Sequence, residues 1–123
     1  AARAVEVDGA KVLAARVEAS SAEALRSQVD VVRDRLGSGI VVLGAVIDGA
    51  PRLVAAVTDD LVGLGYHAGR VVKEVATELG GSGGGRPHLA EAGGRDADRL
   101  DAALSNVPAI VAAVGPSGQR APR

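Results

Sequence analysis

The 123 residues are enough for one domain, and 14 basic against 15 acidic side chains give a net charge of −1, which excludes a uniformly basic nucleic-acid binder. The absence of cysteine and the presence of only two histidines exclude disulfides and thiolate metal sites and disfavour a zinc site made of protein ligands. No apolar run approaches the roughly 18 residues needed to span a bilayer, and no signal peptide opens the chain, so we expect a cytoplasmic domain.

The first residues predict a tight β-hairpin. Residues 4–7 and 11–18 read as short strands, and Asp8-Gly9 lies between them. This dipeptide suits a two-residue turn, because both central positions of such a turn take a positive φ.

A helix is predicted over residues 22–36. Apolar residues recur there at helical spacing, and most charged residues fall on the other faces. Ser20 lies three residues before Glu23, which is the spacing of a capping box. Gly37 supplies a natural end to the helix.

The hairpin-helix unit then recurs. Residues 40–47 and 52–57 are nearly unbroken apolar runs on either side of a turn at residues 48–51. Such runs are typical of central strands, which can be covered on both faces. The acids at residues 59–60 predict a short helical turn, and an apolar stripe predicts a helix over residues 68–79.

The C-terminal part predicts a third helix and a tail. The helix begins near Asp96, and Pro108 bends or restarts it before it continues to Val114. From Gly115 onward the composition predicts a disordered tail over residues 115–123. Residues 1–114 are therefore predicted to form one α+β domain, a two-layer sandwich of order β-β-α-β-β-α with a glycine-rich loop and a C-terminal helix.

The glycine-rich loop is the first candidate site. Glycine fills residues 80–85 apart from Ser82. Backbone N–H groups without side chains around them can converge on a phosphate, and Arg86 can add a forked, charge-assisted contact. A flexible linker is the alternative. We expect the conformation to exclude a β-branched residue, for example at Gly84.

Basic residues near the loop extend this candidate site. Arg70 and Lys73 lie near the start of the second long helix, and with Arg86 and Arg95 they can form a basic patch. The alternative is a solvated helix face with Glu74 and Glu78 paired to these cations, or Arg86 paired to Glu91.

The two histidines are read differently. His88 lies within the glycine-rich region and can donate to a phosphate. His67 precedes a helix and is interpreted as a capping or packing residue.

No catalytic constellation is visible. The paired acids Asp59-Asp60 and Asp96-x-Asp98 lie where helices start, so the helix dipole explains them. The glycine run lacks the lysine of a phosphate loop, and it follows a predicted helix rather than the strand that a dinucleotide fingerprint requires.

The glycine-rich segment resembles a known signature. Residues 81–94, with the sequence GSGGGRPHLAEAGG, resemble the DHHA1-type C-terminal domain of alanyl-tRNA synthetases, also called C-Ala. The similarity extends upstream to a Leu…Asp…Arg-Leu-Gly-Ser-Gly pattern with a following Val-Val-Leu, formed by Leu25, Asp30, Arg35–Gly39 and Val41–Leu43. It also includes an Ala-Gly…Val-Lys helix start, formed by Ala68-Gly69 and Val72-Lys73. The resemblance covers residues 4–104. The sequence departs from the family at Ser82, where lysine is usual, and at His88, where an acid is frequent.

The resemblance implies a role in RNA binding. The parent enzyme has an aminoacylation domain that uses ATP and an editing domain that holds zinc, whereas this domain is non-catalytic and binds no cofactor. It contacts the outer corner of the tRNA, where the D and T loops meet, so that one tRNA serves both active sites. A helical segment that supports dimerisation is absent ahead of Ala1, so we expect the isolated domain to be a monomer. The predicted nucleic-acid-binding residues are Arg70, Lys73, Gly81, Ser82, Gly83, Gly84, Gly85, Arg86, His88 and Arg95.

Three alternatives stay open. The first is the phosphate-binding DHHA1 domain of a DHH phosphoesterase, in which a histidine directly follows three glycines; here Arg86 and Pro87 intervene, which favours the synthetase. The second is the C-terminal domain of a free-standing alanyl-tRNA editing protein. The third is a structural module that docks against its own parent enzyme.

Overall fold

A single mixed sheet organises the chain. The computed structural model describes residues 4–116, and its six strands lie in the order β1-β2-β3-β4-β6-β5. The bounds of the strands are β1 Val5–Val7, β2 Ala10–Arg16, β3 Ile40–Ile47, β4 Ala50–Val57, β5 Ser82–Gly85 and β6 Leu89–Gly93. The α-helices are α1 Ala22–Leu36, α2 Asp59–Gly63, α3 Ala68–Thr77, α4 Leu100–Ser105 and α5 Val107–Val114, and a 3₁₀ turn spans Ala97–Arg99. The predicted α+β class is confirmed.

Two aspartate-glycine turns set the registers of the first four strands. Asp8 and Gly9 have φ of 51° and 86°, and Asp48 and Gly49 have φ of 53° and 80°. These values fit the primed turns whose twist matches that of paired strands. The second turn is tighter than predicted, because β4 begins directly after Gly49. Between the two hairpins, β2 and β3 pair in parallel, so α1 is the crossover that this pairing requires.

Helix α1 has the predicted bounds but a different cap. Its N-cap is Ser21, whose hydroxyl accepts a hydrogen bond from the N–H of Ala24 at 3.0 Å. The capping box predicted from Ser20 is therefore wrong by one residue, because the extended residue nearest the helix is Ser21. Gly37 ends the helix at φ 79°, as predicted.

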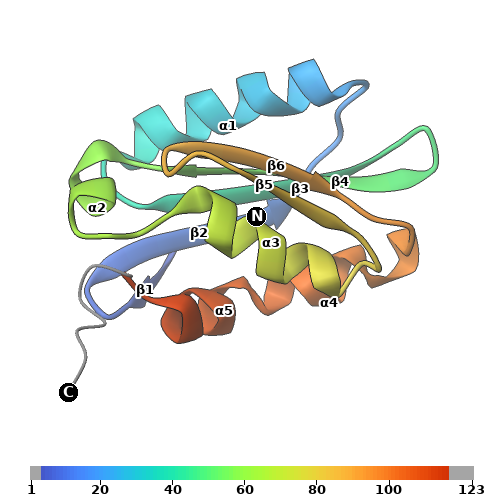
Figure 1. Cartoon of the computed structure of the whole chain (residues 1–123). Helices are drawn as coiled ribbons and strands as arrows, with labels where there is room; N and C mark the ends of the chain where they lie inside the picture. Colours follow the sequence, from blue (N-terminus) through green and yellow to red (C-terminus); the bar gives the residue numbers. More distant parts are fainter. Residues whose placement is uncertain (1–3, 117–123) are drawn as a thin grey trace.

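Helices cover both faces of the sheet (Figure 1). Leu25 and Val29 of α1 pack on one face, against side chains that include Val41 and Leu43. Helices α3, α4 and α5 pack on the other face, against the alternate apolar side chains of β3 and β4, which include Ile40 and Val42. The predicted two-layer sandwich is wrong, because the continuous apolar runs of β3 and β4 supply a core on each face. The interpretation of those runs as doubly covered strands is confirmed.

The C-terminal helix is divided. Asn106 separates α4 from α5, and Pro108 lies in the first turn of α5, where the missing N–H of proline is tolerated. Gly115 ends α5 at φ 60°. The rest of the predicted tail, from Ser117 onward, lies outside the described residues.

The glycine-rich segment is a strand rather than a loop. Residues 82–85 form β5, which pairs with β6 in an antiparallel hairpin at the edge of the sheet. The predicted element order therefore lacks two strands. Strand propensity is low for glycine, so the sequence pattern gave no sign of this hairpin.

Candidate nucleic-acid interface

The β5–β6 hairpin is the most exposed part of the predicted site. All four residues of β5 are exposed, and residues 86–88 form the turn that leads into β6. The N–H of Arg86 donates to the carbonyl of Leu89 at 3.0 Å, which closes the turn. The hairpin thus presents Arg86 and His88, both exposed, at one end of the sheet edge.

Close approach of the two strands requires glycine at alternate positions. A Cβ added at Gly81 would collide with the carbonyl oxygen of Gly93, and one added at Gly83 would collide with the side chain of Ala92. A Cβ at Gly85 would lie 2.8 Å from the Cα of Ala90. These three glycines are therefore structural requirements of the hairpin.

Gly84 differs from its neighbours. No atom lies within 4 Å of the position that its Cβ would take, and its φ is not positive. The expectation that the backbone at Gly84 excludes a β-branched residue is therefore wrong. The position faces open space, while the crowding falls on the glycines on either side of it.

Helix α3 begins against the hairpin. The N–H of Ala68 donates to the carbonyl of Pro87 at 2.9 Å, across the junction between helix and turn. A Cβ added at Gly69 would lie 2.8 Å from the carbonyl oxygen of Gly85, so the helix and β5 are in direct backbone contact. This packing holds Arg70, in the first turn of α3, close to the Arg86 turn.

His67 is the N-cap of α3, which confirms its interpretation as a capping residue. Its Nδ1 accepts a hydrogen bond from the N–H of Arg70 at 3.3 Å, so the ring is neutral at that nitrogen. Partial burial, and secondarily the positive charge of Arg70, lower the pKa of His67 below its ordinary value of 6.5.

Four predicted cations are exposed and carry no internal partner. Within residues 4–116, the side chains of Arg70, Lys73, Arg86 and Arg95 make no ion pair or hydrogen bond. The alternative pairings are wrong, because Glu91 pairs with Arg26 at 2.7 Å and Glu78 accepts from Asn106. The charges of these four cations are thus available to an external anion.

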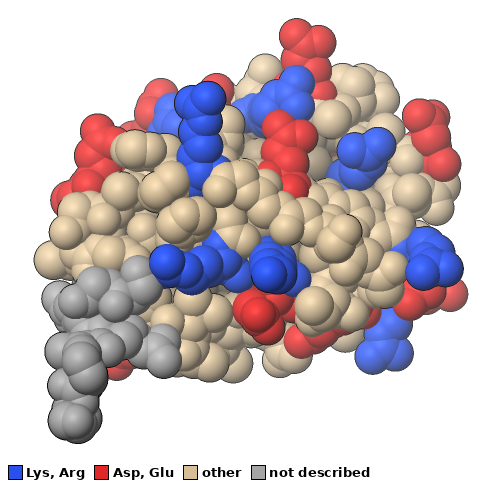
Figure 2. Space-filling model, in the orientation of Figure 1, with Lys and Arg blue, Asp and Glu red and all other residues tan. Residues whose placement is uncertain are grey.

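The cations are not gathered into one cluster. Arg70 and Lys73 lie on α3 beside the turn that carries Arg86, whereas Arg95 follows β6 at the opposite end of the hairpin. The N–H of Arg95 donates to the carbonyl of Leu79, past the end of α3. Figure 2 shows this side of the molecule, with basic side chains over α3 and acidic side chains interspersed among the basic ones.

Asp59, which the sequence explained only by the start of a helix, also lies beside the candidate site. Nε2 of His88 lies 3.2 Å from Oδ1 of Asp59, and the carbonyl of His88 accepts from the N–H of Val57 at 3.0 Å. Residues 59 and 88 are far apart in the sequence, and no motif links them. The end of β4 is therefore joined to the glycine-rich turn by a backbone hydrogen bond, and the start of α2 is joined to it by the Asp59 side chain.

The neighbouring acid, Asp60, has a structural role. Its carboxylate accepts hydrogen bonds from the hydroxyls of Ser38 and Thr58, and these bonds lower its pKa. Thr58 in turn accepts from the N–H of Gly39 at 3.0 Å. Asp60 thereby ties α2 to the chain segment that enters β3.

Two open grooves adjoin the hairpin turn. One, of about 860 Å³, lies between the end of α1, the start of α2 and His88. The other, of about 600 Å³, lies along the hairpin from Gly84 to Glu91. Among residues 4–116, no group of three or more His, Cys, Asp or Glu side chains could hold a metal ion. Within the same range, none of the helices has the length and apolar character of a membrane span.

Comparison with known families gives a direct result. The model of the DHHA1 domain matches residues 9–113. The chain belongs to the DHHA1 domain family. It is similar to segments of alanine–tRNA ligases from Geobacillus thermodenitrificans, at 50% identity over 109 residues, and from Pelotomaculum thermopropionicum, at 54% over 99 residues. These matches cover 89% and 80% of this chain but only 12% and 11% of the relatives.

Solved structures agree with this family assignment. The C-Ala domain of Aquifex aeolicus alanyl-tRNA synthetase is similar with a TM-score of 0.77 and 25% identity, over 89% of this DHHA1 chain and 98% of that one. A DHH domain described as a member of the s1p family of ribosomal proteins has a TM-score of 0.57 and 14% identity, over 90% of this chain and 28% of that one. The second likeness is one of fold alone. Within the DHHA1 family, this chain therefore resembles the C-Ala domain of alanyl-tRNA synthetase.

Proposed function

We propose that this chain is the tRNA-binding C-Ala domain of an alanine–tRNA ligase and that it contacts the outer corner of the tRNA, where the D and T loops meet. In this role it takes no part in catalysis. It holds one tRNA so that the aminoacylation and editing sites of the parent enzyme can both use it. ATP and zinc belong to those other domains.

The observation that carries the proposal is the exposed β5–β6 hairpin with unpaired cations around it. Arg86 lies in the turn, Arg70 and Lys73 lie beside it on α3, and Arg95 lies at the far end. Four free cations at a sheet edge fit an RNA backbone better than a compact phosphate group, because their charges are spread along the hairpin. Aromatic residues amount to 1% of the chain, so we expect RNA shape and backbone to dominate recognition.

Arg86→Ala tests the proposal. A charge-assisted phosphate contact contributes roughly 1–3 kcal/mol, so the affinity for alanine tRNA should fall by about 5- to 150-fold. The melting temperature should hold, because the Arg86 side chain has no partner within residues 4–116.

Lys11→Ala is the matched control. Lys11 is exposed on β2, which three strands separate from β5, and its loss should leave affinity nearly unchanged. Equal affinities of the Arg86→Ala variant and the unmodified domain for tRNA would refute the assignment of the hairpin.

The free-standing editing protein is the second candidate, because a C-Ala-like domain suits either parent. The residues that precede Ala1 in the longer protein would distinguish the two. Aminoacylation motifs there would identify a ligase, and an editing zinc motif alone would identify the editing protein.

A further inference from the structure

The β5–β6 hairpin has a second surface, on the side of the sheet that faces α1. Ala90 and Ala92 of β6 point into the core shared with α3, so Leu89 and Glu91 point to the α1 side. The cross-strand partner of Glu91 is Gly84. Helix α1 packs on β3 and β4, and the hairpin extends beyond it as an open shelf formed by Gly84, Leu89 and Glu91.

The floor of the shelf is flat and poor in side chains. Gly84 contributes backbone only, with open space where a Cβ would stand. Leu89 is half-buried and adds an apolar patch. The groove of about 600 Å³ that runs along the hairpin is lined by these residues and also by Arg86 and His88. Such a surface admits a planar ring that a side chain at residue 84 would block.

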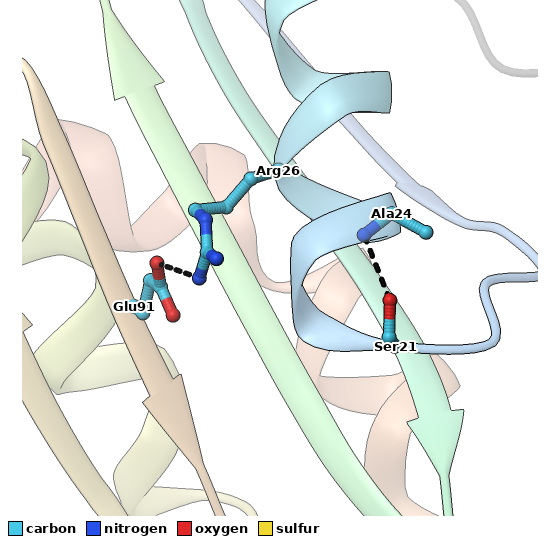
Figure 3. A network of polar contacts seen from close by, with 4 residues as sticks. All are labelled: Ser21, Ala24, Arg26 and Glu91. Atoms are coloured by element: carbon cyan, nitrogen blue, oxygen red, sulfur yellow. Dashed lines mark hydrogen bonds and ion pairs between the residues drawn. The ribbon is translucent and has the colours of Figure 1, made fainter.

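Glu91 lies on this shelf as an oriented hydrogen-bond acceptor. Nη1 of Arg26 donates to Oε2 of Glu91 at 2.7 Å, and Figure 3 shows the Arg26 side chain reaching from α1 toward β6. No residue within the described range 4–116 donates to the other oxygen, Oε1. The Glu91 side chain is 39% exposed. One carboxylate oxygen is thus fixed by the ion pair while the other is free to accept.

The charge of Glu91 indicates which part of an RNA can lie there. A carboxylate repels phosphate, which disfavours the RNA backbone at this point of the shelf. It accepts hydrogen bonds from N–H groups on base edges, and the Watson–Crick edge of an unpaired base is accessible to a protein. Guanine carries adjacent imino and amino N–H groups on that edge. Each carboxylate oxygen has about two lone-pair sites, so one N–H can donate to Oε1 and the other to the second lone pair of Oε2.

We propose that this shelf is a base-reading subsite, in which Glu91 accepts hydrogen bonds from one unpaired guanine. The base lies over Gly84 and Leu89, and Arg86 contacts the neighbouring phosphate. Arg26 acts as a positioning residue through its ion pair with Glu91. The inference rests on the proposed RNA-binding function and adds base selectivity to it.

Short labelled oligoribonucleotides test the subsite directly. A uridine pentamer with a central guanosine is compared with the all-uridine pentamer by fluorescence anisotropy at low salt. We expect the domain to prefer the guanosine pentamer about tenfold, equivalent to about 1.4 kcal/mol. A central inosine, which lacks the amino group, should give intermediate affinity. Equal binding of the three pentamers would overturn the inference.

Glu91→Gln separates base reading from simple repulsion. The preference for guanosine should fall toward unity, while binding of the all-uridine pentamer holds or rises because Arg26 is released. Glu6→Gln, at β1 on the opposite edge of the sheet, should keep the preference. An equal gain in affinity for every pentamer in the Glu91→Gln variant would mean that Glu91 only repels RNA, and the subsite would be rejected.

A second variant covers the case in which Glu91→Gln destabilises the fold. Gly84→Val fills the open space over the shelf and should remove the guanosine preference without unfolding the domain. A retained preference in this variant would overturn the inference. Failure of the wider RNA-binding function is recognised separately, since the domain would then fail to bind alanine tRNA whatever the pentamers show.

Discussion

Glycine-to-alanine substitutions at two adjacent positions of β5 should affect the stability of the domain differently. At Gly83, an added Cβ would lie 2.5 Å from the carbonyl oxygen of Glu91 and would collide with Ala92. The colliding groups include backbone, which cannot rotate away, so Gly83→Ala should cost about 1–3 kcal/mol as overpacking does elsewhere. At Gly84 nothing lies within 4 Å, so Gly84→Ala should be neutral or stabilise by up to about 1 kcal/mol through the unfolded chain.

Thermal unfolding followed by circular dichroism measures this difference. With about 4–8 °C per kcal/mol for a domain of this size, Gly83→Ala should lower the melting temperature by roughly 5–20 °C. The melting temperature of Gly84→Ala should stay the same or rise by a few degrees. Equal melting temperatures for the two variants, or a larger loss at Gly84, would refute the reading of alternate glycines as packing requirements.

Four further predictions follow from individual contacts. Binding of alanine tRNA should be about micromolar or weaker at physiological salt. The proposed interface has three or four phosphate contacts at roughly −0.7 to −0.9 each, so the slope of log K against log salt should be near −3. A salt-insensitive complex would contradict the cation assignment. Asp59→Asn should raise tRNA affinity about two- to fivefold in the same titration, because it removes a carboxylate 3.2 Å from His88, while Asp101→Asn on α4 should raise it less. The pKa of His67 is lowered in the folded state, so the unfolded chain binds the proton more tightly. The contribution of neutral His67 to stability should be complete above the ordinary pKa of 6.5 and should decrease as the pH falls below that value. His67→Asn should flatten this part of a plot of melting temperature against pH. Incubation of the domain with ATP, alanine and tRNA, and separately with mischarged tRNA or cyclic dinucleotides, should give no turnover, and turnover that persists through repurification would show that a catalytic site was overlooked.

Local chemistry predicted the elements that depend on few residues. The turn at Asp8-Gly9 and the end of α1 at Gly37 need a positive φ, and glycine at those positions indicates it directly. The apolar periodicity of residues 22–36 fixed the bounds of α1 because the helix buries one narrow stripe. The same reasoning placed the helix cap one residue too early, since two adjacent serines satisfy the pattern almost equally.

Pairings between distant segments could not be predicted from the sequence. Glycine has low strand propensity, so β5 owes its strand conformation to β6, which forms its partner only in the folded hairpin. The partners of Glu91 and His88 are Arg26 and Asp59, and each pair joins elements that no local spacing relates. The sequence therefore marked the segment around Arg86 as a candidate site through its composition and its cations, while the hairpin itself and the partners of Glu91 and His88 emerged only from the fold.

The packing of the hairpin does not explain the glycine at residue 84. The glycines at 81, 83 and 85 are needed because the strands approach closely, so their presence says nothing about a ligand. Gly84 meets no such demand, and glycine in a strand interior costs roughly 0.5–1 kcal/mol relative to alanine. No packing contact in the folded hairpin requires glycine at this position, so none offsets that cost. The compensation is expected on the surface instead, where the missing side chain keeps the shelf beside Glu91 open to a base.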